Sequence, residues 1–245
     1  MKFTAPRWAA AIATVIAIAG STHWWLQRER HTYLPGVTTD FVAIFPPPPP
    51  ADSAATRAEL DDLLTLQSKR TDVEVNAARR DRKTEVERFY GALGFAPGAD
   101  PDLPLLLGLA ERVEDEIRPY VRAAKDRFRR LRPYEIEERM KPCIANVRGD
   151  LSYPSGHASF GYVMAYLLEE LVPEREAELM ARADEFARQR MVCGVHFKSD
   201  LEAGRRGAQW LVQALLASEA YRADAQSARI ELRTALKLPD VPRQH

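Results

Sequence analysis

The sequence has little that would indicate a metal, a nucleic acid or a polytopic membrane protein. Its 35 Lys and Arg residues balance 35 Asp and Glu residues, so the net charge gives no hint of a nucleic-acid partner. Its two cysteines form no C-x-x-C motif and no H-E-x-x-H motif occurs. Beyond the amino-terminal region, no apolar stretch is long enough to cross a bilayer. We therefore expect no metal, no cofactor and no nucleic-acid partner.

Signals for β-structure are also weak. No segment alternates convincingly between apolar and polar residues, no internal repeat is visible, and Ala, Leu, Glu and Arg dominate the composition. A chain of 245 residues fits one domain with appendages. The sequence therefore predicts an all-α protein whose single helical-bundle domain spans residues 52–240.

The first residues have the pattern of an export signal. Lys2 and Arg7 precede an apolar stretch, and Ala17-Ile18-Ala19 resembles a cleavage site, which predicts a signal peptide at 1–19. Residues 8–26 could instead remain as an uncleaved anchor, since they are long enough to span a bilayer. Either interpretation predicts a periplasmic or secreted protein, with membrane contact only if the anchor stays.

Two features leave alternatives open. Cys143 and Cys193 could pair in an oxidising compartment or remain as buried thiols. Residues 20–51 are predicted to be an extended arm, and its five consecutive prolines, Pro46–Pro50, form a stiff polyproline segment. That segment could serve as a linker or lie on the domain.

Helical spacing of apolar residues defines the remaining elements. The strongest pattern covers His157–Val172, where a continuous apolar stripe predicts a buried helix. Asp52 or Ser53 is predicted to cap the first helix, Pro119 to kink or split the second and Pro133 to end it, and the capping box Ser199-Asp200-Leu201-Glu202 to open the fifth. The full set of predicted helices is 52–93, 105–131, 157–172, 174–190, 199–217 and 221–238.

Lys125 and Arg132 form the first candidate cluster. Seven residues are about two helical turns, so both cations project from nearly the same face. Such a pair suits a phosphate, because Arg grips two oxygens while Lys acts as a point charge. The neighbouring arginines, including Arg130, are interpreted as a solvated charged face, and that reading also competes for the pair itself.

Ser155, Gly156 and His157 form the second cluster, directly before the best helix. Free backbone N–H groups and the helix dipole make this position an anion site, to which Ser155 adds a hydroxyl donor. His157 could give a proton to a leaving oxygen there. The competing interpretation is an N-cap serine beside an incidental histidine.

Arg190, His196 and Asp200 form the third cluster. A carboxylate four residues after a histidine can fix its tautomer and make its other nitrogen more nucleophilic, although a capping Asp and a surface His would have the same spacing. Together the three clusters supply cations, a helix N-terminus, a proton donor and an oriented nucleophile, which are the parts needed for phosphoryl transfer without a metal.

These motifs resemble a known family. Lys125-x6-Arg132-Pro133, Pro154-Ser155-Gly156-His157 and Arg190-x5-His196-x3-Asp200 have the spacing of the type-2 phosphatidic acid phosphatase superfamily, which includes vanadium haloperoxidases. The proline run and the stretches Ser152–His157 and Val192–His196 are similar to class A bacterial non-specific acid phosphatases. The resemblance covers roughly residues 40–235.

The resemblance implies an all-helical fold and a broad-specificity acid phosphatase that is sensitive to vanadate. It implies that His196 attacks phosphorus, Asp200 orients His196, and His157 protonates the leaving group and then activates water. The implied ligands of the phosphoryl group are Lys125, Arg132, Ser155, Gly156 and Arg190.

One departure from the family is Gln189, where the family usually has Ser, and we expect it to affect rate or specificity. Expected partners are phosphorylated small molecules, namely phosphomonoesters and nucleotides. Homo-oligomers are common in the family, but no interface can be located from the sequence. Hydrolysis of nucleoside di- or triphosphates or lipid phosphates, a haloperoxidase, and non-catalytic phosphate binding are the competing functions.

Overall fold

The computed structural model describes residues 32–36, 39–145 and 149–239, and every regular element within these ranges is a helix. The all-α prediction is therefore confirmed. From Tyr33 onward the chain belongs to one compact unit. The predicted signal peptide and anchor lie outside the described residues.

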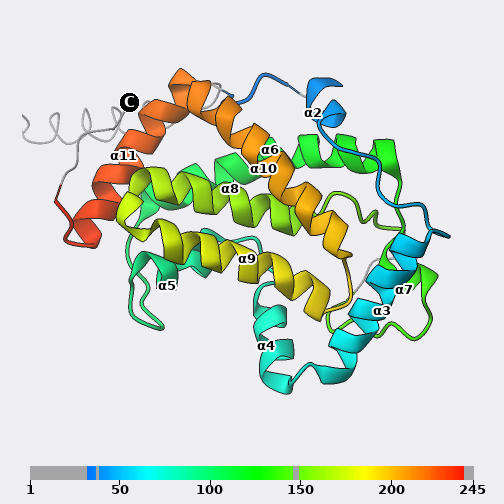
Figure 1. The fold of residues 1–245 in the computed structure, drawn as a ribbon. Coiled ribbons are helices and arrows are strands. Elements are labelled where there is room, and N and C mark those ends of the chain that lie inside the picture. Colours follow the sequence, from blue (N-terminus) through cyan, green and yellow to red (C-terminus); the bar gives the residue numbers. More distant parts are fainter. Residues whose placement is uncertain (1–31, 37–38, 146–148, 240–245) are drawn as a thin grey trace, which may run out of the picture. The chain divides into compact units, whose positions relative to one another are not determined.

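The centre of the unit is α8 (Gly156–Leu171), which packs against α9 (Glu176–Val192) and α10 (Lys198–Ala217), as Figure 1 shows. Most of α8 is buried because its apolar side chains continue around the helix instead of occupying one stripe. Two further helices, α6 (Pro104–Phe128) and α11 (Glu219–Ala235), pack against each other and against α8.

The long helix α6 differs in two respects from its prediction. It runs through Pro119 without being split, and it ends at Phe128, because Arg129 adopts a left-handed conformation with φ of 49°. Pro133 therefore does not end this helix. It begins a separate short helix, α7 (Pro133–Ile136), where its fixed φ suits the first helical position.

The segment predicted as one helix from 52 to 93 is divided in the structure. Ser53 caps α3 as predicted, with its hydroxyl accepting a hydrogen bond from the amide of Thr56. The helical elements in this region are α3 (Ala54–Lys69), α4 (Asp72–Arg80), η2 (Val86–Phe89) and α5 (Tyr90–Leu93). A second cap at Thr71 starts α4 in a new direction, which the apolar periodicity did not reveal.

Pro46–Pro50 lies on the domain as an arm. The hydroxyl of Tyr153 donates to the carbonyl of Pro46 over 2.7 Å, and that of Thr56 donates to the carbonyl of Pro50 over 2.8 Å. The amino-terminal side of this arm is not wholly extended as predicted, because α2 (Thr39–Ala43) forms there and buries Phe41.

The two junctions that flank α9 differ from their predictions, and the second holds His196 and Asp200. Pro173 starts a 3₁₀ turn, η3 (Pro173–Arg175), before α9 begins. The predicted capping box at Ser199 is wrong, since α10 begins earlier and the carboxylate of Asp200 accepts from the amide of Phe197 over 2.9 Å. This shift places Asp200 inside the first turn of α10, facing the protein interior.

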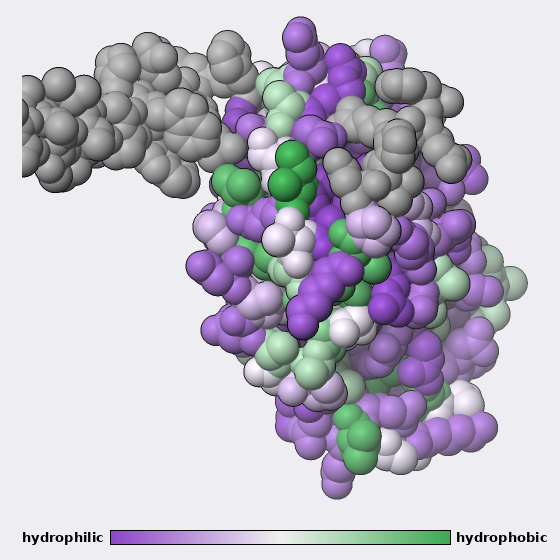
Figure 2. Space-filling model, turned by 90° about the vertical axis from the view of Figure 1, so that its left-hand side faces the viewer, coloured by the Kyte–Doolittle hydropathy of each residue, from purple (hydrophilic) through white to green (hydrophobic). Residues whose placement is uncertain are grey.

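Cys143 and Cys193 form a disulfide, with their Cα atoms 4.7 Å apart. Of the two alternatives left open by the sequence, the structure thus has the paired one. No helix among the described residues is both long enough and apolar enough to span a bilayer. On the face drawn in Figure 2, hydrophobic side chains occur in small separate groups among hydrophilic ones.

Candidate active site

His196 lies in the turn between α9 and α10 and is almost fully buried. Gly194 makes this turn, with φ of 66°, and a Cβ atom there would come within 2.7 Å of Met140 Sδ. The amide of Val195 then donates back to the carbonyl of Arg190. The turn thus returns the chain toward α9 and brings His196 and Arg190 to the same site.

Contacts on both ring nitrogens define the tautomer of His196. Arg132 Nη1 lies 3.0 Å from Nε2, and because a guanidinium only donates, Nε2 must be the unprotonated nitrogen. The proton is therefore on Nδ1, which lies 3.1 Å from Asp200 Oδ2. The lone pair of Nε2 consequently points toward the cations, as a nucleophile for phosphorus requires.

Asp200 is fully buried and accepts from several donors. Oδ2 also accepts from the hydroxyl of Ser152 and the amide of Phe197, and Oδ1 accepts from Arg130 Nη1 over 2.8 Å. Burial raises the pKa of Asp200, while Arg130 and these hydrogen bonds oppose that rise. Burial and the neighbouring cations lower the pKa of His196 well below its usual value, so its ring remains neutral.

The structure brings Lys125, Arg132 and Arg190 together around His196. Arg132 is held by the backbone carbonyls of Asp150 and Val195, and by the Asp150 carboxylate. The ammonium group of Lys125 donates to the carbonyl of Leu151. Each of the two side chains is thereby aimed from the end of α6 or the start of α7 into the site.

Arg190 uses few of its N–H donors within the described part of the protein. Its Nη1 makes one long contact of 3.5 Å to the carbonyl of Asp81, and its buried Nε has no hydrogen-bond partner among the described residues. Burial and then repulsion from Arg132 lower the pKa of Lys125 to about 8 and that of Arg190 to about 10. A buried, unsatisfied cation beside two others indicates a site built for an anion.

Ser155, Gly156 and His157 occupy the N-terminus of α8, as predicted. The amide of Ser155 donates to the carbonyl of Asp200, which ties this terminus to the start of α10. Ser155 Oγ accepts from the amide of Ala158, so it is an N-cap. Among the described residues nothing accepts its hydroxyl proton, so Ser155 can also donate to a phosphoryl oxygen.

His157 is largely buried, and its Nε2 donates to the carbonyl of Arg82 over 2.8 Å. Burial, followed by the charge of Arg190, lowers its pKa to about 3. His157, Gly156 and Lys125 line a pocket of about 610 Å³ that also includes Ile117, Val121 and Phe160. This pocket gives the leaving group of a substrate room beside His157.

Sequence reasoning missed several contributors. Arg130 was interpreted as part of a solvated face, but it is buried and bonded to Asp200. The turn after α4 was not considered, although the carbonyls of Asp81 and Arg82 contact Arg190 and His157. Its position depends on the ion pair of Asp81 with Arg182, a partner 101 residues away that no local motif reveals.

Gln189 does not face the cations. Its Nε2 donates to Glu185 over 3.3 Å, and its buried Oε1 has no partner among the described residues. Any effect of this residue on rate must therefore pass through the packing of α9. In the part of the chain that the structure describes, no cluster of three or more metal-ligating side chains occurs.

Comparisons with known proteins point to one superfamily. A family model described as the PAP2 superfamily matches residues 107–217, which include all three clusters. The chain is 31% identical over 167 residues to a non-specific acid phosphatase of Salmonella typhimurium, covering 65% of this chain and 67% of that protein. It is 29% identical over 204 residues to an acid phosphatase of Zymomonas mobilis, covering 79% of this chain and 77% of that protein.

A solved structure, a bacterial vanadium-dependent iodoperoxidase, matches with a TM-score of 0.54 at 20% identity. The match covers 74% of this chain and 54% of the iodoperoxidase. At this level of identity the similarity concerns the fold alone.

Proposed function

Because this chain belongs to the PAP2 superfamily and has acid phosphatases among its relatives, we propose that it hydrolyses phosphate monoesters through a phosphohistidine intermediate. The relatives support phosphatase activity. The histidine nucleophile, the independence from metals and a broad substrate range are the further parts of the proposal. The observation that carries it is the lone pair of His196 Nε2, which faces three cations while Nδ1–H is held by Asp200.

The first step transfers the phosphoryl group from the ester to His196. The Nε2 lone pair attacks phosphorus, and the bond from phosphorus to the ester oxygen breaks. Arg132 exchanges its contact with Nε2 for a phosphoryl oxygen, and Lys125 and Arg190 neutralise the remaining charge. The Gly156 amide and Ser155 hydroxyl add donors at the helix N-terminus.

His157 is the proton donor in the first step and the proton acceptor in the second. In the substrate-free protein it is neutral, because burial and the cations lower its pKa to about 3. A phosphate dianion cancels part of that positive charge and raises the pKa of His157, so that the ring can hold a proton for the leaving oxygen. In the second step His157 takes a proton from water, which attacks phosphohistidine and releases phosphate and His196.

The test is hydrolysis of p-nitrophenyl phosphate in excess EDTA by the wild type and by His196→Ala. We expect turnover that survives the chelator and is abolished in the variant, which must keep the wild-type circular dichroism spectrum. Normal turnover in His196→Ala would refute the mechanism, and loss in EDTA would refute metal independence. A panel of sugar phosphates, nucleotides and a lipid phosphate measures the substrate range.

We also propose a periplasmic or secreted location. The disulfide between Cys143 and Cys193 forms readily only in an oxidising compartment, and residues 1–19 have the pattern of a signal peptide. Fractionation of expressing cells, with thiol alkylation before lysis, tests the proposal. Protein in the cytoplasmic fraction with two alkylated cysteines would contradict it.

A further inference from the structure

The carboxylate that orients His196 is itself held by a second, buried ion pair. While Asp200 Oδ2 faces the histidine, Oδ1 accepts from Arg130 Nη1 over 2.8 Å. Arg130 is 9% exposed and lies between α6 and α7 in the chain. Its guanidinium also stacks over the ring of Phe197, 3.9 Å from the centroid. These contacts leave it little freedom.

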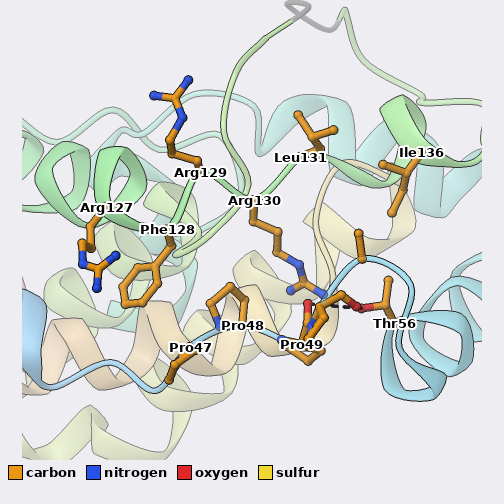
Figure 3. A pocket seen from close by; sticks show the side chains of 12 residues that line it. Pro47, Pro48, Pro49, Thr56, Arg127, Phe128, Arg129, Arg130, Leu131 and Ile136 are labelled. Atoms are coloured by element: carbon orange, nitrogen blue, oxygen red, sulfur yellow. Dashed lines mark hydrogen bonds between the residues drawn. The ribbon is translucent and has the colours of Figure 1, made fainter.

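The other end of Arg130 is held by Glu59 of α3. Arg130 Nη2 donates to Glu59 Oε2 over 2.8 Å, and the same carboxylate accepts from the amide and hydroxyl of Ser199 over 2.7 and 2.9 Å. Arg130 Nη1 donates to the Ser199 hydroxyl over 2.7 Å, which closes the network. Figure 3 shows the side chain of Arg130 extending from the segment between α6 and α7 toward Pro49 and Thr56, near the start of α3.

We propose that Glu59 and Arg130 are positioning residues that hold Asp200 in the orientation required by the nucleophile His196. The inference rests on the proposed function, because it assigns these residues a purpose in the same reaction. It also makes α3, which contributes none of the motif residues, a necessary part of the active site. Neither residue contacts the cations that hold phosphate, so their effect is on the nucleophile and not on substrate binding.

The charges around Asp200 give this arrangement a pH dependence. His196 and Arg130 contact the carboxylate directly, Lys125 on α6 and Tyr153 before α8 interact with it electrostatically, and Glu59 acts through Arg130. Burial raises the pKa of Asp200 and Arg130 opposes that rise. Without Arg130, Asp200 takes up a proton at a higher pH, and a protonated carboxyl no longer holds the Nδ1 proton of His196.

The experiment compares Arg130→Gln, Arg130→Lys and Glu59→Gln with two controls that remove the same charges from exposed neighbours, Arg129→Gln and Asp62→Asn. We expect Arg130→Gln to lower kcat for p-nitrophenyl phosphate by roughly tenfold to a hundredfold, with KM and inhibition by inorganic phosphate little changed. The acidic limb of its kcat profile should move to higher pH. Arg130→Lys should restore the limb but only part of kcat, because its single ammonium cannot bridge both carboxylates.

Glu59→Gln should lower kcat by a smaller factor, and both controls should match the wild type. Wild-type kcat and an unmoved acidic limb in Arg130→Gln would overturn the inference. A loss that is equal at every pH and accompanied by a weaker phosphate affinity would do the same, since it indicates a structural contact alone.

A second measurement is independent of turnover. In protein labelled with ¹⁵N-histidine, the Nδ1–H of His196 should exchange slowly with solvent in the wild type, because Asp200 accepts it, and faster in Arg130→Gln. The contact of Arg132 with Nε2 keeps the same tautomer in both proteins. Equally slow exchange in the variant would overturn the inference even if the protein hydrolyses no phosphate ester. Conversely, if the wild type has no turnover, or if His196→Ala retains it, the proposed function is refuted and the exchange of this proton alone tests the network.

Discussion

Gly204 of α10 allows the N-terminus of α8 to approach, and its replacement by alanine is the sharpest test of how the site is assembled. A Cβ atom at this position would come within 2.7 Å of Ala158 Cβ, 2.8 Å of the carbonyl oxygen of Ser155 and 3.0 Å of the amide nitrogen of Ser159. Two of these neighbours are backbone atoms, which cannot rotate away. Gly204→Ala must therefore move α8 and α10 apart.

The expected cost follows from two opposing effects. Alanine improves helix propensity by about 1 kcal/mol, whereas overpacking a rigid contact costs about 1–3 kcal/mol. Because backbone must move, we place the overpacking at its upper end and expect a net loss of about 1–2 kcal/mol. For a domain of this size that lowers Tm by about 2–8 °C. Ser155 and His157 move with the helix, so kcat/KM for p-nitrophenyl phosphate should fall as well.

The matched control is Gly108→Ala in α6, where an added Cβ atom meets nothing within 4 Å. It should raise Tm slightly and leave kcat/KM unchanged. Thermal unfolding and steady-state kinetics of both variants test whether the contact between α8 and α10 sets stability and activity. If Gly204→Ala were as stable and active as Gly108→Ala, the close contact between α8 and α10 would not be what places Ser155 and His157.

Two further predictions concern the proton and the charge at the site. Lys125 carries its charge only below its pKa of about 8, so kcat/KM should fall as the pH rises through 8. Lys125→Arg should move that fall to higher pH, because arginine keeps its charge. The same fall in both proteins would contradict this assignment. His157→Ala should reduce turnover of alkyl phosphates by roughly 10²–10⁴-fold and of p-nitrophenyl phosphate by less, because a good leaving group needs no proton. Equal losses across a series of leaving groups would show that His157 is not the acid.

The sequence predicts those parts of the site that depend on local geometry. His196 and Asp200 are four residues apart, a spacing that allows the carboxylate to hold the histidine, although a capping Asp beside a surface His would have the same spacing. Ser155, Gly156 and His157 directly precede the strongest apolar stripe, so their location at a helix N-terminus follows from periodicity. Lys125 and Arg132 do interact at the site, but the helical repeat that predicted their pairing is not the reason, because α6 ends at Phe128 and Arg132 is the N-cap of α7.

Other parts depend on contacts between distant segments, and no local pattern contains them. Arg130 has the same surroundings in sequence as Arg129, but only Arg130 is buried, because Glu59 lies 71 residues away on a helix that packs beside it. The pairing of the cysteines, 50 residues apart, is of the same kind. The breaks between α3, α4 and α5 were missed because a cap such as Thr71 starts a new helix without interrupting the apolar pattern of the sequence.

The gathering of Lys125, Arg132 and Arg190 has a consequence for folding as well as for chemistry. Burial and mutual repulsion lower the pKa values of Lys125 and Arg190, so bringing the three cations together raises the free energy of the folded protein. An anion that binds only the folded state lowers the free energy of that state, by about 2.7 kcal/mol when the anion's concentration is a hundred times its Kd. Inorganic phosphate, the product of the proposed reaction, is the anion that we expect to do this. The protein is thus expected to be most resistant to unfolding when its own product occupies the site and turnover is lowest.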